Sequence, residues 1–482
     1  MRVLYVDLDC CRSDHLSVNG YRRRTSPAID AIAADGVSFR RCFAANSPCL
    51  PSRASLFSGR FGIQNGVVAH HGPGERFRVT SAGHGRDPRY PMWPYVLWRA
   101  GMHTVSLSSF AHRHNAWWFA DGWAEQHSLI QGGQETAAEV NRLALPWFKD
   151  HAREDNWFVH LHYWDLHSHY RLSQADAARF ADEPAPDWPD DDTIRRQFET
   201  FYGPRSGRDL FANYEPKSGS ADKSPTPIMP DHVSNRAEFK RLIDGYDAAI
   251  HHVDRHIAQV LDVLADAGVL DDTAVIFSAD HGDSFGEHGQ YMDHGIANDA
   301  VHNIPLIIRW PGVTHGQGPE QKPTHGGGWE SRPERTPSPL RGEGGVRDAG
   351  SNPHPALSLK GRGVTHSDAL VYGMDLAPTV LDLLGLPTPS GWDARSVAPA
   401  LRGEPFPGRP YLVMDHGIYT LTRAVRTPDH LLIRMLHPGC YPYDDPVYLH
   451  DLNADPHQTV NLAASRPDLV GDLSAKLAEW KD

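Results

Sequence analysis

The chain has 482 residues, of which 40% are hydrophobic, 10% aromatic and 22% charged. These proportions are typical of folded proteins with two to three domains, or one large enzyme fold with a smaller appendage, and exclude overall disorder and collagen-like repetition. The 60 acidic and 47 basic residues give a net charge of −13. Such a surface repels a phosphate backbone, so nucleic acid is not expected as a partner.

The cysteine pattern and the N-terminus bear on the cellular compartment. Five cysteines form no CxxC pair, which argues against a disulfide framework or a zinc knuckle and favours a reducing compartment. The first ten residues contain one basic residue and two aspartates, and no apolar run is long enough to span a bilayer. We therefore expect a cytoplasmic protein without membrane contact.

The first elements alternate between strand and helix. A buried strand is expected at Val3–Val6, followed by Asp7 and Asp9 at its carboxyl end. Open α/β sheets bind their ligands at this end of the strands. A helix is expected from Pro27, and the strand Val37–Phe39 follows it.

The same alternation continues along the chain, and acids again follow two of the strands. The expected elements are the strand 157–164 before Asp165 and His167, the helix 246–264, the strand 275–279 before Asp280, and the strand 304–310. This order predicts an α/β protein with a large central, mostly parallel sheet flanked by helices. The 30 histidines of the chain indicate a polar site.

The C-terminal part begins with a break in this order. Residues 313–366 are rich in Gly, Pro and charge and lack hydrophobic periodicity, so we expect a disordered insertion. An amphipathic helix is expected at 368–386, and residues 408–482 read as short strands and a final helix. We therefore expect a catalytic domain at 1–387 and a smaller C-terminal α+β lobe at 388–482, with an antiparallel sheet plus a helix.

A short duplication borders the insertion. The tetrapeptide Gly-Val-Thr-His at 312–315 recurs at 363–366, 51 positions later. A direct repeat that flanks low-complexity sequence is typical of an in-frame insertion, although chance in a Gly-rich region is the simpler alternative. Because loops tolerate extra length at small entropic cost, deletion of residues 316–366 is expected to preserve the fold.

The most specific motif runs from Cys49 through Pro51, Ser52 and Arg53 to Gly59-Arg60. It resembles the signature of the sulfatase family, the formylglycine-dependent type I sulfatases of the alkaline phosphatase superfamily. The resemblance implies that a maturating enzyme oxidises Cys49 to formylglycine, the nucleophile. Proline at 51 suits the first turn of a helix, which would put Cys49 at a helix N-terminus that favours an anion.

The resemblance also implies a metal site. Asp9 matches the first metal-binding acid, whereas Cys10 replaces the second, and Asp7 could compensate because residues i and i+2 of a strand share a face. Asp280 and His281, in an Asp-His-Gly string, match the second half of the site, to which formylglycine from Cys49 adds a ligand. Oxygen-rich donors suit Ca²⁺, with Mg²⁺ or Mn²⁺ as alternatives.

Sulfate contacts follow from the resemblance at further positions. His167 matches a residue that binds the sulfate or leaving-group oxygen, and His294 lies where the family has a lysine. Arg113 and His114 lie where a second family lysine is absent. Their side chains could bind an anion. Either His167 or His294 could protonate the leaving oxygen.

The implied activity is metal-dependent hydrolysis of a sulfate ester to an alcohol and inorganic sulfate, with Cys49, Arg53, His167 and His294 as catalytic residues. The expected partners are a small-molecule or saccharide sulfate ester and, transiently, a formylglycine-generating enzyme. Two alternatives remain: a phosphonate monoester or phosphodiester hydrolase of the same superfamily, and a non-catalytic relic or binding protein. Loss of both lysines weakens the sulfatase reading, whereas the full-length layout supports it.

Overall fold

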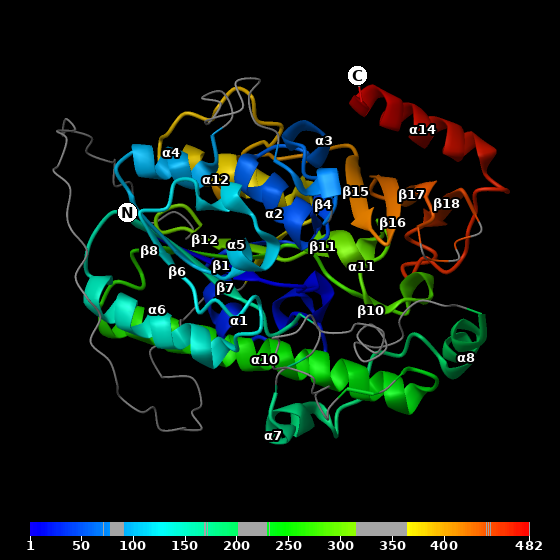
Figure 1. Cartoon of the computed structure of the whole chain (residues 1–482), viewed down its shortest axis with the longest axis horizontal. Coiled ribbons are helices and arrows are strands. Elements are labelled where there is room, and N and C mark those ends of the chain that lie inside the picture. The colour runs from blue at the N-terminus through cyan, green and yellow to red at the C-terminus, as the bar shows by residue number, and fades with distance from the viewer. Residues whose placement is uncertain are drawn as a thin grey trace.

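The structure is a computed structural model that describes residues 1–70, 72–77, 91–167, 170, 172–200, 229–230, 232–314, 364–439, 441, 443 and 445–481. An eight-stranded sheet lies at its centre, with helices on both faces (Figure 1). The strands of this sheet, in spatial order, are β13 (Thr365–Ser367), β2 (Val37–Phe39), β12 (Leu306–Arg309), β8 (Thr273–Ala279), β1 (Arg2–Leu8), β7 (Trp157–Tyr163), β5 (His103–Leu107) and β6 (Glu125–His127).

The sheet is parallel except at one strand. β1 pairs in parallel with β7 on one side and with β8 on the other, whereas β12 runs antiparallel to β8 and β2. β7 and β8 are buried along their whole length, as expected of central strands with near-continuous apolar sequence. Because β1, β7 and β8 run in one direction, the residues that follow them meet at one edge. The predicted mostly parallel sheet is thus confirmed.

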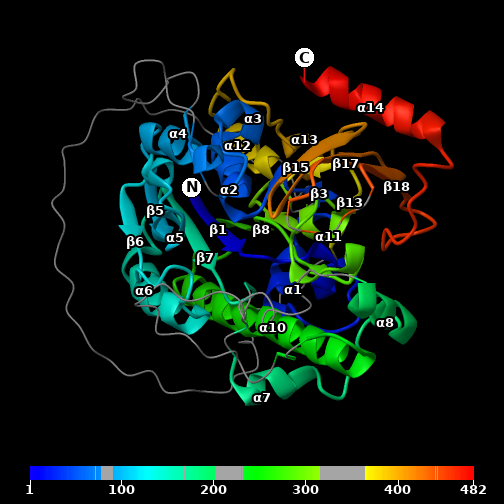
Figure 2. The ribbon, with the colours of Figure 1, turned by 45° about the vertical axis from the view of Figure 1, so that its right-hand side comes forward.

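Helices cover both faces of this sheet. α10 (Arg236–Asp266) and α6 (Ala137–His151) lie on one face, and α2 (Cys49–Ser58), α4 (Trp93–Arg99) and α12 (Leu376–Leu383) on the other (Figures 1 and 2). The apolar positions of α10 are buried against the sheet, as its periodicity predicts. The other described helices are α1 (Pro27–Ala33), α3 (Gly62–Asn65), α5 (Phe110–His114), α7 (Gln174–Ala177), α8 (Asp191–Thr200), α11 (Asp299–His302), α13 (Ala398–Leu401) and α14 (Pro467–Lys481).

A separate, mainly antiparallel sheet forms the C-terminal part, as predicted. Its order is β18 (Val447–Asp451), β17 (His430–His437), β16 (Thr420–Arg426), β15 (Leu412–Ile418) and β4 (Asn46–Ser47). α14 packs on it through Leu473 and Leu477. The edge strand β4 comes from the residues just before Cys49 and pairs in parallel with β15, so the C-terminal sheet is joined to the N-terminal part of the chain. The division at 387/388 stays a prediction.

Two expected elements differ from the structure. The strand predicted at 304–310 is divided at Pro305 into β11 (Asn303–Ile304), which pairs with β3 (Cys42–Phe43), and β12, which belongs to the central sheet. Proline has no N–H for the ladder, so a strand breaks there. The helix predicted from 368 begins later, because residues 371–372 form β14 (Val371–Tyr372) beside β3.

The remaining short strands, β9 (Ser284–Phe285) and β10 (Tyr291–Asp293), form a two-stranded sheet. Of the disordered insertion predicted at 313–366, residues 315–363 lie outside the described residues. The prediction is wrong at its C-terminal end, because Thr365 and His366 pair with β2 as part of β13. None of the helices in the described part of the chain combines the length and the apolarity that crossing a membrane requires.

Candidate active site

The carboxyl ends of β1 and β8 bring two aspartates together. Asp9 follows β1 and Asp280 follows β8, and the two strands are in register from their first residues to their last. The backbone N–H of Cys10 donates to Asp280 Oδ1 at 3.0 Å. Both carboxylates are fully buried. Buried carboxylates need a counter-charge or a metal ion.

Arg53, on α2, supplies part of that counter-charge. Its Nη1 lies 2.9 Å from Asp9 Oδ2 and 2.6 Å from Asp280 Oδ2, and its Nε lies 2.9 Å from Asp7 Oδ2. Burial opposes the ionisation of Asp7 and Asp9, but the Arg53 guanidinium and the neighbouring histidines together outweigh it and lower the pKa of both carboxyls. At Asp280 burial prevails and raises the pKa.

Cys49 begins α2 at the same point. Its Sγ lies 3.2 Å from His281 Nε2, and the next turn is fixed to β8 because Ser52 Oγ donates to the carbonyl of Asp280 at 2.7 Å. Burial raises the pKa of the Cys49 thiol well above its ordinary value. The motif around Cys49 and the Asp-His string therefore meet in space, although more than 200 residues separate them.

The charges of this region suit a divalent cation. Asp7, Asp9 and Asp280 carry three negative charges against the one positive charge of Arg53, all four side chains being fully buried. His281 Nδ1 lies 2.9 Å from the Gly282 carbonyl, so Nδ1 carries the proton and the lone pair of Nε2, which faces Cys49, can bind a cation. The carboxylates and this nitrogen fit the cation that the family resemblance implies.

Within the described residues, three overlapping groups have donor atoms that could hold an ion, each within 4.8 Å of the others of its group. They are Cys49, Asp280 and His281; Asp9, Cys10 and His167; and Cys10, His281, Asp283 and His294. Asp7, expected to replace the missing acid, belongs to none of them. Both of its oxygens face Arg53, and His160 Nε2 lies 3.2 Å from Oδ2.

Arg113, on α5, contacts His167. Its Nη2 donates to His167 Nε2 at 3.0 Å, its Nη1 donates to the carbonyl of Gly132 at 2.8 Å, and its guanidinium lies 5.1 Å above the ring of Trp164. The sheet thus brings Arg113 and His167 together, although 54 residues separate them.

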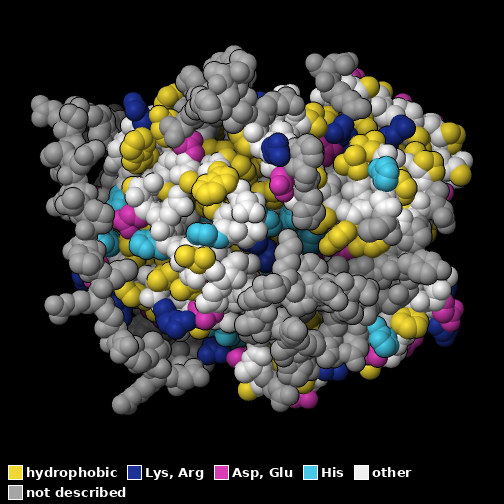
Figure 3. All heavy atoms as spheres, viewed as in Figure 1, with side chains coloured by type: hydrophobic (Ala, Val, Ile, Leu, Met, Phe, Trp, Pro, Cys, Tyr) yellow, Lys and Arg dark blue, Asp and Glu magenta, His cyan; other side chains and the backbone are white. Residues whose placement is uncertain are grey.

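His114 faces a second imidazole. Its ring lies 4.9 Å from that of His70, whose Nε2 accepts a hydrogen bond from the backbone N–H of Leu50 at 3.1 Å. Burial lowers the pKa of both imidazoles well below their ordinary value. Histidine side chains gather near the middle of the face shown in Figure 3.

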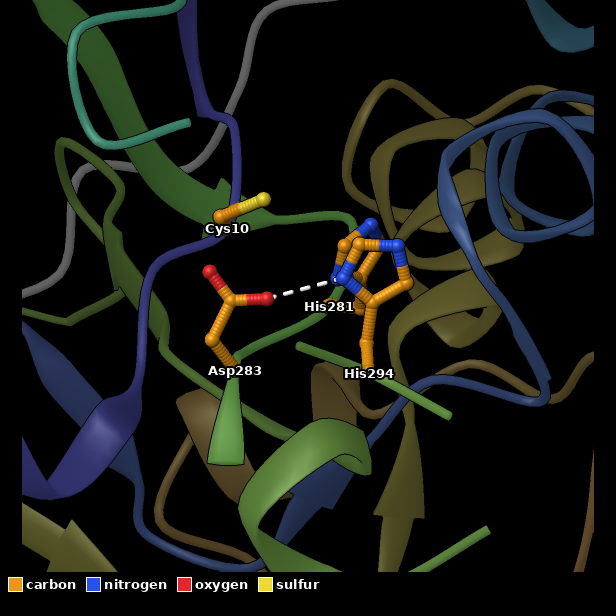
Figure 4. A group of neighbouring side chains, drawn as sticks. All are labelled: Cys10, His281, Asp283 and His294. Atoms are coloured by element: carbon orange, nitrogen blue, oxygen red, sulfur yellow. Dashed lines mark hydrogen bonds and ion pairs between the residues drawn. The ribbon is translucent and has the colours of Figure 1, made fainter. Parts of the chain in front are cut away.

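His294 follows β10 and contacts Asp283 and His281. Its Nδ1 lies 2.8 Å from Asp283 Oδ1, and its ring lies 4.5 Å from that of His281 (Figure 4). Burial opposes the positive charge on His294, but Asp283 outweighs it and raises the pKa of His294 to about 8. Asp283 lies three residues after Asp280 in the same motif.

Four residues of this region were not identified from the sequence. They are His70, His160, His162 and Asp283. His160 and His162 alternate along the buried strand β7, and Arg53 Nη2 lies 2.7 Å from His162 Nε2. Alternate polar residues in an otherwise apolar strand are the signal that marks them, because they share one face. His70 has no such signal, since it lies in a loop.

A mostly parallel sheet with a buried, charged centre at the carboxyl ends of its strands defines an enzyme of the open α/β class. The family model described as Sulfatase matches residues 2–386, and the chain belongs to this family of hydrolases. Human (Homo sapiens) N-sulphoglucosamine sulphohydrolase is 24% identical over 510 residues, covering 95% of this chain and 85% of the relative.

Solved structures share the fold. A protein in complex with its substrate D-glucosamine-2-N,6-O-disulfate aligns with a TM-score of 0.70 and 18% identity, covering 100% of this chain and 97% of that one. A phosphonate monoester hydrolase of Agrobacterium radiobacter aligns with a TM-score of 0.66 and 18% identity, covering 100% and 95%. At these identities the likeness concerns the fold alone.

Proposed function

We propose that the protein hydrolyses the sulfate ester of a saccharide to an alcohol and inorganic sulfate, with a nucleophile derived from Cys49. The observation that carries this proposal is the meeting of Cys49 with His281 and Asp280, because Cys49 Sγ lies 3.2 Å from His281 Nε2. Membership of the sulfatase family supports the reaction. The relative that acts on N-sulphoglucosamine supports a sugar substrate.

Two groups beyond the unmodified side chains belong to this proposal. Formylglycine from oxidation of Cys49 would supply a hydrated aldehyde whose hydroxyl attacks sulfur. A divalent cation on Asp9, Asp280, His281 and the modified Cys49 would lower the pKa of that hydroxyl and neutralise sulfate oxygens. Oxygen-rich donors favour Ca²⁺, with Mg²⁺ or Mn²⁺ as alternatives.

The other residues hold and protonate the substrate. Arg53 fixes the orientation of Asp9 and Asp280 through its Nη1. Arg113 contributes a positive charge beside His167, where it would bind the anionic ester. His167 or His294 would donate a proton to the leaving alcohol oxygen, because an imidazole titrates near neutral pH.

A phosphonate monoester is the second candidate substrate. The fold of the Agrobacterium radiobacter hydrolase favours it, and histidine or arginine stands at both positions where the family's lysines are expected. A third reading, a non-catalytic relic, requires that Cys49 stays unmodified. Turnover of an aryl sulfate and of an aryl phosphonate by the same preparation separates the first two.

The experiment begins with coexpression of the chain with a formylglycine-generating enzyme and intact-mass measurement of residue 49. Matured protein is expected to hydrolyse sulfated glucosamines, and Cys49→Ala is expected to abolish turnover while the fold is kept. Cys42→Ala is the matched control, because Cys42 is also fully buried but lies on β3. Activity that survives in Cys49→Ala contradicts the proposal, as does matured protein that cleaves only the phosphonate.

A further inference from the structure

One group of side chains near the site combines sulfur, nitrogen and oxygen donors. Cys10, His281, Asp283 and His294 come from the ends of β1, β8 and β10 and lie around one point (Figure 4). One donor atom of each lies within 4.8 Å of the others. Three of the four are buried, and His294 is almost so. Four convergent donors of these kinds are the ligand set of a transition metal.

The backbone of Cys10 is held in a conformation that cysteine rarely adopts. Its φ is 56°, in the left-handed region that disfavours most residues with a Cβ atom. Asp280 accepts its N–H at 3.0 Å, and Tyr246 Oη donates to its carbonyl at 2.8 Å. Strain of this kind persists only where the surroundings fix it, and it occurs mostly at functional sites. Here it fixes the direction of the thiol.

His294 is oriented as a metal-binding histidine is. Its Nδ1 lies 2.8 Å from Asp283 Oδ1, which fixes the plane of the ring. A carboxylate on one ring nitrogen is the usual partner of a histidine whose other nitrogen binds a metal ion. When an ion displaces the proton on Nε2, His294 contributes a neutral imidazole and Asp283 contributes a carboxylate oxygen.

We propose that Cys10, Asp283 and His294, with His281 as a shared ligand, bind a Zn²⁺-class ion. Thiolate and imidazole ligands select such ions, whereas Ca²⁺ takes six to eight oxygen ligands. On binding, the Cys10 thiol releases its proton to solvent and its sulfur bonds to the metal. With His281 as the fourth ligand, the four side chains complete the tetrahedral coordination that Zn²⁺ prefers.

Because both groups need His281, a Zn²⁺-class ion on the mixed group and a cation on the group with Cys49 and Asp280 cannot be bound at the same time. His281 offers one lone pair, at Nε2, so an ion on the mixed group withdraws it from the group with Cys49 and Asp280. If His294 binds the ion, His167 is the imidazole that remains to protonate a leaving oxygen. The proposed ion site does not depend on which ester the enzyme cleaves.

The test uses the full chain after treatment with a chelator. Co²⁺ serves as a probe, because a cobalt–thiolate bond gives a charge-transfer absorption that oxygen and nitrogen ligands do not. We expect this band in the wild type, and its loss in Cys10→Ser. Cys11→Ser is the matched control, since Cys11 is the neighbouring buried cysteine and its Sγ faces the Arg12 carbonyl at 3.8 Å. Cys49→Ser should keep the band.

Calorimetric titration with Zn²⁺ and Ca²⁺ gives the affinities. Zn²⁺ should bind more tightly than Ca²⁺, and Cys10→Ser should weaken Zn²⁺ binding by at least about 10- to 100-fold, the loss that removal of a partner of a ligand already causes. His294→Gln, which leaves β1 unchanged, should weaken it similarly, and Cys10→Asp should shift the preference toward Ca²⁺. The proposal is overturned if the band persists in Cys10→Ser, if it depends on Cys49, or if Ca²⁺ binds more tightly. Aryl sulfate turnover, measured separately, tests the proposed function alone.

Discussion

Replacing Arg53 by methionine removes the guanidinium that three buried carboxylates share. Its side chain and those of Asp7, Asp9 and Asp280 are fully inaccessible to solvent. Breaking one buried ion pair costs about 3–5 kcal/mol, because the remaining charge has no partner. The three pairs share one cation and are not additive, so we expect a loss of at least that size. The total free energy of unfolding of a typical protein is only about 5–15 kcal/mol.

The measurement is urea unfolding of metal-free protein at neutral pH, followed by circular dichroism. Arg40→Met is the matched control. Its guanidinium also bonds one carboxylate twice, that of Asp368, but the two side chains are 44% and 56% exposed. An exposed pair contributes only about 0–1 kcal/mol. Should Arg53→Met prevent folding, Arg53→Lys keeps the charge and is expected to lose less.

Two results would refute this reasoning. One is a free energy of unfolding for Arg53→Met within about 1 kcal/mol of the wild type, since a broken buried pair costs more. The other is an equal loss in the Arg40→Met control, which would make burial irrelevant. A divalent cation added to the Arg53→Met protein is expected to restore part of the stability, because it replaces the lost positive charge.

Three further predictions follow from other parts of the molecule. Burial lowers the pKa of His302 to about 4, below its unfolded value, so its contribution to stability is complete above about pH 6.5 and is lost as the pH falls toward 4. His302→Gln should therefore flatten the fall in Tm between neutral and acidic pH, and an unchanged slope would contradict the assignment. Arg113→Gln should lower kcat/KM for a sulfate ester by about 10- to 100-fold, the size of a charged hydrogen bond, with Tm nearly unchanged; a normal kcat/KM would remove Arg113 from the substrate site. Deletion of residues 316–366 should keep turnover and give equal or higher Tm, whereas a folded, metal-binding variant that loses most of its kcat/KM would identify the segment as a lid.

Two of the residues that this deletion removes belong to the central sheet. The cut removes Thr365 and His366, which pair with β2 at Val37 and Ser38. The retained copy of the repeat carries the same residues, and Thr314 Oγ1 already donates to the carbonyl of Asp35 at 2.8 Å. Thr314 and Thr365, the corresponding threonines of the two copies, thus contact neighbouring residues at the start of β2, and we expect the retained copy to take the place of the one removed.

The central strands were predictable because their burial leaves a strong mark on the sequence. β1 and β8 read as apolar runs that end in an acid, and the register of parallel strands then brings Asp9 and Asp280 together. Short strands and edge strands leave a weaker pattern in the sequence. β4 and β14 have two residues each, too few for any periodicity.

Within the candidate site, the positions of motif residues were predictable, whereas their partners were not. Cys49 and His281 belong to distinctive strings, and their contact was expected from the family resemblance. The bonding of Asp7 to Arg53 and His160 depends on the order of strands in the sheet, which the sequence does not display. Asp283 directly follows the Asp-His-Gly string in the sequence, but only its contact with His294 shows that it belongs to the site.

The pairing of β4 with β15 sets an order of events during synthesis. Asn46 and Ser47 bond along Asp415 and His416, and β15 is the only strand that pairs with β4 in the described part of the chain. A ribosome has to add almost 370 residues after Ser47 before this partner exists. The segment that carries Cys49, only 1% exposed in the folded protein, is therefore among the last to be closed. If Cys49 is oxidised to formylglycine as proposed, the maturating enzyme would have that interval in which to reach the thiol.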